Sequence, residues 1–165
     1  MRRELLGGLF GLVAFGGLQA QTVEPDGIAL AGATPDAVPP QEVSFDYGAV
    51  ERALTATPGD PEAGRQVFVD RKLGNCLACH VNAQIEEQPF HGEIGPPLDG
   101  VGERWSEAEL RGIVTNPKQM FEGTIMPAFY RPDAGARVAE AFKGETILTA
   151  QQVEDVVAYL QTLKE

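Results

Sequence analysis

The stretch Cys76-Leu77-Ala78-Cys79-His80 decides how this chain folds. It has the C-x-x-C-H spacing of covalent c-type haem attachment. Two thiols three residues apart on one helical turn can each add to a haem vinyl group, and the next residue brings an imidazole to the iron. The pattern therefore predicts one covalently bound haem c. Cys76 and Cys79 are its attachment points, and His80 is the proximal iron ligand.

The same two cysteines fit two other kinds of site. C-x-x-C is also the spacing of a redox dithiol and of half a zinc site. A thioredoxin-like dithiol needs a βαβ setting, which the sequence does not offer. Zinc could take Cys76, Cys79, His80 and His91, but the adjacent Cys79 and His80 would have to point at the same tetrahedral ion. Covalent haem is therefore the favoured interpretation of the motif.

The N-terminus has the parts of a secretory signal peptide. Met1-Arg2-Arg3 carries positive charge, residues 5–18 form an apolar run with five glycines, and a small residue, Ala20, follows. That run is shorter than the roughly 20 apolar residues that span a bilayer. We expect residues 1–20 to be removed near Ala20, the protein to be periplasmic, and the mature form to have no membrane anchor.

Charge and composition limit the classes of function. The chain has 165 residues, of which 43% are hydrophobic, and 13 Lys plus Arg against 24 Asp plus Glu give a net charge of −11. Phosphate backbones and anionic membrane surfaces repel a chain this acidic, so nucleic-acid binding is not expected. The length suits one compact domain with appendages.

Two regions follow the signal peptide. Residues 21–60 are rich in Pro, Gly, Ala and acidic residues and show no lasting helical or strand period, which predicts an extended arm or linker. One short stretch of it, residues 47–55, is a candidate helix. Residues 61–165 form the predicted haem domain.

Three helices are predicted in residues 61–165 from their N-terminal signals. The first begins at Pro61 after Asp60 as N-cap, and the others begin after capping boxes, Ser106 with Glu109 and Thr149 with Gln152. The middle helix ends before Pro117. The last helix has the apolar spacing of a buried face. Its apolar residues are Val153, Val156, Val157, Leu160 and Leu163. No run alternates as a strand would, so the domain is predicted to be all-α.

Two more ligand-site features lie downstream of the motif. The rigid loop Gly95-Pro96-Pro97-Leu98 can present the Pro96 carbonyl to the second ring nitrogen of His80. Met126 lies 46 residues beyond His80 and is the predicted distal iron ligand. Met120 and His91 compete with it; we expect Met120 to pack and His91 to stay on the proximal side. Arg104 and Trp105 are candidates for contacts with the haem propionates.

Four features together resemble a class I cytochrome c: the stretches at residues 76–80, 95–98 and 126–127, and the helix at residues 153–163. In that family the first and last helices cross at a small residue and an aromatic, which face an apolar residue and an aromatic. Gly64 and Phe68 match the first pair, and Val156 and Tyr159 match the second. The resemblance implies the class I cytochrome c fold, here with an N-terminal extended arm.

Longer strings extend the resemblance to the SoxX-type monohaem cytochromes, the smaller subunits of SoxAX complexes of bacterial sulfur oxidation. These strings are residues 71–76, 92–98, 104–105 and 125–131. The resemblance implies a heterodimer with a larger SoxA-type cytochrome subunit. Such a complex oxidatively joins thiosulfate to a cysteine of a carrier protein, as an L-cysteine S-thiosulfotransferase. The SoxX-type haem passes the released electrons to a downstream acceptor cytochrome.

We expect this chain to contain no catalytic residue, because the sulfur chemistry would take place on the partner subunit. Haem occupies both cysteines, and an iron ligated by His and Met has no open position for substrate. We therefore expect a non-catalytic electron-transfer subunit of a thiosulfate-oxidising complex. The alternative is a freestanding periplasmic class I cytochrome c that shuttles electrons.

Overall fold

The computed structural model describes residues 36–133, 135, 138, 140 and 143–165. The predicted signal peptide, its cleavage site near Ala20 and residues 21–35 of the predicted arm lie outside these residues. Within the described part there is no strand, only one isolated bridge between Asp46 and Ala49. No helix there is long and apolar enough to cross a membrane.

Four α-helices and three short 3-10 helices make up the described elements. The α-helices are α1 (Pro61–Val69), α2 (Val101–Arg104), α3 (Glu107–Thr115) and α4 (Ala150–Thr162). The 3-10 helices are η1 (Pro40–Glu42), η2 (Cys76–Ala78) and η3 (Pro117–Gln119). The prediction of an all-α domain is confirmed for the described residues.

The predicted N-terminal signals start α1, α3 and α4. The Asp60 side chain accepts a hydrogen bond from the Glu62 N–H at 2.9 Å, with Pro61 at the first helical position. Both predicted capping boxes, at Ser106 and at Thr149, form with reciprocal hydrogen bonds. Each satisfies backbone donors that a helix start leaves without partners.

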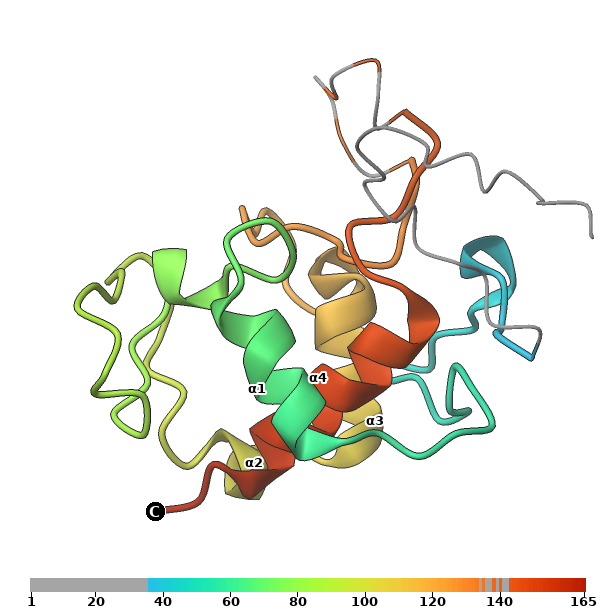
Figure 1. Ribbon diagram of the computed structural model, residues 1–165. Coiled ribbons are helices and arrows are strands. Elements are labelled where there is room, and N and C mark those ends of the chain that lie inside the picture. The colour runs from blue at the N-terminus through green and yellow to red at the C-terminus, as the bar shows by residue number, and fades with distance from the viewer. Residues whose placement is uncertain (1–35, 134, 136–137, 139, 141–142) are drawn as a thin grey trace, which may run out of the picture. The chain divides into compact units, whose positions relative to one another are not determined.

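Helices α1 and α4 cross in contact at the centre of the core (Figure 1). Gly64 makes the close approach possible, because a Cβ at this position would lie 1.9 Å from the Asp155 carbonyl oxygen. One turn later Phe68 packs edge-on against Tyr159, with ring centroids 5.3 Å apart. Val156 is buried beside them. These are the four residues that the resemblance placed at the crossing.

The candidate helix at residues 47–55 is wrong. Residues 46–49 form a tight turn in which Asp46 and Ala49 exchange two backbone hydrogen bonds, and Tyr47 and Gly48 both have positive φ. The next residues lie extended against α3, where the Val50 N–H donates to the Ala108 carbonyl at 2.9 Å. A helix would have withdrawn that donor from α3.

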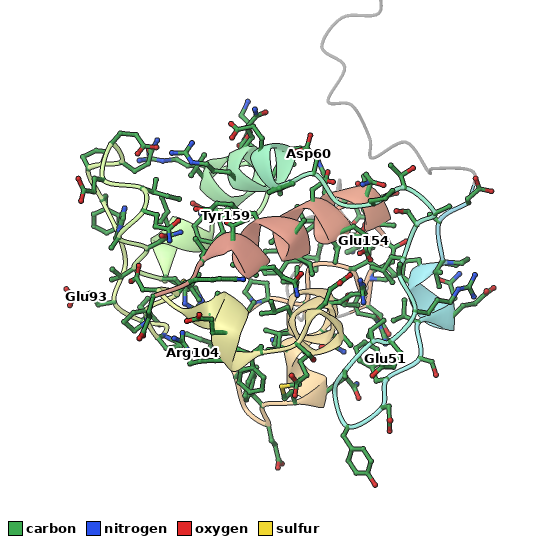
Figure 2. All side chains as sticks on the ribbon, turned by 90° about the horizontal axis from the view of Figure 1, so that it is seen from below. Glu51, Asp60, Glu93, Arg104, Glu154 and Tyr159 are labelled. Atoms are coloured by element: carbon green, nitrogen blue, oxygen red, sulfur yellow. The ribbon has the colours of Figure 1, made fainter. Side chains whose placement is uncertain are left out.

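The described part of the arm is packed onto the haem domain through apolar residues and one buried ion pair. Val38, Val50 and Leu54 are buried. Arg111 of α3 donates to both carboxylate oxygens of Glu154 of α4, at 2.8 and 3.0 Å, and also to the Val50 carbonyl at 2.9 Å. The same carboxylate accepts the Leu54 N–H at 2.8 Å. In Figure 2, Glu154 lies on α4 on the side where the arm carries Glu51.

Removing the Glu154 carboxylate should destabilise the protein strongly. Glu154→Ala leaves the Arg111 guanidinium buried without its partner and orphans the Leu54 N–H, a loss of about 3–5 kcal/mol in the free energy of unfolding. Urea unfolding monitored by circular dichroism measures it. Glu107→Ala is the matched control, because Glu107 pairs with the same guanidinium but is 57% exposed, and we expect a loss below about 1 kcal/mol. Equal losses in the two variants would contradict the burial argument.

Tyr47→Asn should stabilise the protein. Tyr47 has φ +47° and is 98% exposed, so it is held in a left-handed conformation without packing in return. Asparagine tolerates this conformation, and we expect a gain of about 0.5–1 kcal/mol in the free energy of unfolding. Tyr47→Phe keeps the strain and should leave the urea midpoint unchanged. A lower midpoint for Tyr47→Asn would show that the tyrosine side chain contributes to stability.

Candidate haem site

The C-x-x-C-H motif forms a single tight turn. Asn75, in the left-handed conformation at φ 48°, opens the 3-10 helix Cys76–Ala78. The Cys76 carbonyl then accepts backbone hydrogen bonds from Cys79 at 3.1 Å and from His80 at 2.9 Å. Both cysteines and the histidine therefore lie on one tight turn, as the spacing predicted.

The His80 ring is oriented by the downstream loop. Its Nδ1 lies 2.7 Å from the Pro96 carbonyl oxygen. A carbonyl only accepts, so Nδ1 carries the proton and donates it, which leaves the lone pair of Nε2 free for a metal. This is the contact that the Pro96 prediction requires.

The loop at residues 92–98 is hydrogen-bonded directly to the motif. The Gly92 N–H donates to the Leu77 carbonyl and the Gly95 N–H to the Cys79 carbonyl, each at 2.7 Å. At residue 95 only glycine fits, because a Cβ there would lie 2.3 Å from Cε1 of His80. The sequence analysis gave these two glycines no role. Their spacing, three residues apart and just before a Pro-Pro pair, was the sequence signal that could have predicted this close contact.

Both ring nitrogens of His91 are engaged with the backbone of the segment after the motif, and its place on the proximal side stays a prediction. Nδ1 accepts from the Asn82 N–H at 3.4 Å, and Nε2 donates to the Ile85 carbonyl at 3.2 Å. Sequence reasoning also missed the Asn82 side chain, which is fully buried and donates to the Tyr159 hydroxyl at 2.9 Å. That hydrogen bond ties the loop to α4.

The two candidate methionines differ in their surroundings. Met120 packs against the turn of the arm, where a Cβ on Gly48 would lie 2.9 Å from its own Cβ. Met126 is half-buried against the core, and its N–H donates to Thr124 Oγ1 at 3.2 Å. The Lys118 ammonium donates to the Met126 carbonyl. Packing therefore engages Met120, and Met126 stays the predicted distal ligand.

Arg104 and Trp105, the residues predicted to meet the propionates, make contacts of their own. The Arg104 guanidinium donates to the carbonyls of Asp99, at 2.5 Å, and Pro97, at 3.2 Å. Trp105 packs edge-on against Phe121, with ring centroids 5.9 Å apart. A contact of either residue with a propionate stays a prediction.

The Cys76 side chain packs against the core, and burial raises the pKa of its thiol to about 12. Cys76 and Cys79 are not joined by a disulfide. Among the described residues, no three His, Cys, Asp or Glu side chains gather as metal ligands.

Comparison with known proteins assigns the family. The family model described as cytochrome c matches residues 61–164. This chain belongs to the cytochrome c family. The cytochrome is 29% identical over 129 residues to cytochrome c2 of Rhodospirillum rubrum, a match that covers 64% of this chain and 99% of the relative.

A solved structure matches the cytochrome over more of its length. A chain in the crystal structure of SoxXA from P. pantotrophus is 51% identical, with a TM-score of 0.73. The match covers 78% of the cytochrome and 99% of that chain. The predicted resemblance to a SoxX-type class I cytochrome c is confirmed, and the cytochrome binds haem c covalently.

The residues present fit that haem. Cys76 and Cys79 are free of a disulfide and lie within one turn, and His80 is held by Pro96 with Nε2 available. The haem supplies a one-electron redox couple, and the predicted ligation by His80 and Met126 would favour its reduced state. The Pro96 carbonyl fixes the orientation of the His80 imidazole.

Met126→Ala should abolish the methionine-to-iron charge-transfer band of the oxidised protein, because the thioether ligand is lost. The absorption spectrum of the haem-loaded variant measures it. Met120→Ala is the matched control and should keep the band, since Met120 packs against Gly48. The reverse pattern, with the band lost only in Met120→Ala, would move the distal ligand to Met120.

Proposed function

We propose that this cytochrome is the electron-transfer haem subunit of a periplasmic complex that oxidatively couples thiosulfate to a cysteine of a carrier protein. The observation that carries the proposal is the 51% identity to a chain of SoxXA over 78% of this one. The complex as a whole would act as an L-cysteine S-thiosulfotransferase. This subunit would take the released electrons.

The electron count explains why a haem subunit is needed. Joining thiosulfate to a cysteine thiol forms one S–S bond and releases one proton and two electrons. A single haem iron accepts one electron at a time. This subunit would therefore be reduced twice for each thiosulfate coupled and would pass both electrons to a downstream acceptor cytochrome.

The sulfur chemistry itself would take place on the larger SoxA-type partner. In the haem-loaded chain Cys76 and Cys79 are thioethers, so no thiol remains to carry sulfur. With His80 and Met126 as proximal and distal ligands, no coordination position is open to thiosulfate. This subunit would thus have no catalytic residue.

The runner-up function is a freestanding periplasmic electron carrier, as the similarity to cytochrome c2 over 99% of that relative would also allow. Because the arm is packed into the core, deleting it does not distinguish the two functions. Deleting residues up to Thr55 would remove Val38, Val50 and Leu54 from the core and would destabilise either kind of protein. A reconstituted reaction separates the two functions better.

We expect thiosulfate to reduce the haem of this subunit only when the larger partner and the carrier protein are both present. Periplasm from the native host is fractionated by haem absorbance, and co-eluting proteins are identified by mass spectrometry. The purified complex is then mixed with reduced carrier and limiting thiosulfate. Stopped-flow absorbance should show two haem equivalents reduced per thiosulfate when an excess of subunit is supplied.

A carrier protein with its cysteine changed to serine is the control, and it should leave the haem oxidised. Elution of the cytochrome alone, together with no reduction by thiosulfate in the mixture, would favour the freestanding carrier.

A further inference from the structure

The chain around Met126 is exposed before the methionine and buried after it. Phe121 is exposed, Ile125 is 77% exposed, and nothing lies within 4 Å of the position that a Cβ on Gly123 would take. Residues 128–130, by contrast, are all buried. The predicted distal ligand is therefore held mainly by the segment that follows it.

That buried segment is hydrogen-bonded to two other parts of the fold. The backbone N–H groups of Phe129 and Tyr130 donate to the last two carbonyls of α3, each at 3.2 Å. The Phe129 carbonyl accepts from the Leu148 N–H, just before α4, at 2.9 Å. Three residues separate Met126 from Tyr130, and one of them is Pro127, whose φ is fixed. An anchor at Tyr130 therefore limits where the Met126 thioether can move.

The Tyr130 side chain adds a third anchor, which is on the arm. Its hydroxyl donates to the Val38 carbonyl at 2.8 Å, and both residues are buried. The arm is itself held at this point, because the Val38 N–H donates to the Leu54 carbonyl at 2.8 Å. The Leu54 N–H in turn donates to the Glu154 carboxylate of α4 at 2.8 Å. A chain of hydrogen bonds thus runs from α4 through the arm to the segment after Met126.

We propose that Tyr130 is a positioning residue for the distal haem ligand, and that the arm, through this hydroxyl, keeps the Met126 thioether on the iron. A thioether is a soft ligand and binds ferric iron weakly, so the polypeptide around it decides how often it leaves. Without the hydroxyl, the buried Val38 carbonyl loses its donor in the closed form. An open form, in which the thioether has left the iron, then gains population. The proposal rests on Met126 as distal ligand and not on the proposed function.

Imidazole measures the open form, because it binds the ferric iron only after Met126 has left. Its apparent affinity is the affinity of the open form multiplied by the fraction of protein that is open. We expect haem-loaded Tyr130→Phe to bind imidazole about two- to tenfold more tightly than wild type, the factor that corresponds to one lost hydrogen bond. Absorbance titration of the ferric protein measures this affinity, and the methionine-to-iron band should disappear over the same imidazole range.

Tyr159→Phe is the matched control. Tyr159 is as buried as Tyr130, and its hydroxyl accepts from the Asn82 side chain at 2.9 Å. Both variants lose one buried hydroxyl contact and should unfold at lower urea concentration than wild type. Only Tyr130→Phe should change the imidazole affinity. Hydrogen exchange measured by mass spectrometry should also show faster exchange of residues 36–54 and 124–130 in Tyr130→Phe alone.

Three outcomes would overturn the proposal. A wild-type imidazole affinity in Tyr130→Phe would show that the hydroxyl does not hold the distal side. An equal gain in affinity in Tyr130→Phe and Tyr159→Phe would assign the effect to a general loosening of the core. A wild-type ferric protein without the methionine-to-iron band would remove Met126 as the ligand. The titrations contain neither thiosulfate nor a partner protein, so the first two outcomes leave the proposed function intact.

Discussion

The close contact of α1 with α4 at Gly64 is the constraint on which the rest of the structure depends. With α1 lying against the Asp155 carbonyl, α4 becomes the helix that the other three α-helices all contact. Glu154, in the N-terminal half of α4, bonds to the arm and to α3. Tyr159, further along α4, contacts Phe68 and Asn82. Leu163, at the C-terminal end, accepts a hydrogen bond from α2. The haem motif begins seven residues after the end of α1, so the crossing of α1 with α4 also determines where the motif lies.

His80, the predicted proximal ligand, is held by backbone contacts more than by side chains. Gly92 and Gly95 bond the loop to the motif, and the Pro96 carbonyl orients the imidazole. Glycine and proline do this well, because one permits close approach and the other limits the loop's freedom. An electron-transfer site gains from such rigidity, since an iron that keeps its ligands in place changes oxidation state with little rearrangement.

Short-range signals made most of the fold predictable from the sequence. Asp60, Ser106 and Thr149 started their helices as expected, because capping depends on residues two or three positions apart. The motif residues are also local. The Pro96 contact spans 16 residues and was expected because a ligating histidine needs an acceptor for its other ring nitrogen. Residues 47–55 were misread because their partners, Ala108 and Glu154, are distant in sequence. The role of Asn82 also depends on a distant contact, with Tyr159 of α4, which no local pattern reveals.

The packing of the arm also affects the order in which the parts of the protein fold. Leu54 and Glu154 are 100 residues apart, yet their hydrogen bond belongs to the buried pair that joins arm, α3 and α4. Contacts of such long range form late, because the loop between them must first be closed. The arm therefore cannot pack in its final position until α4 has formed.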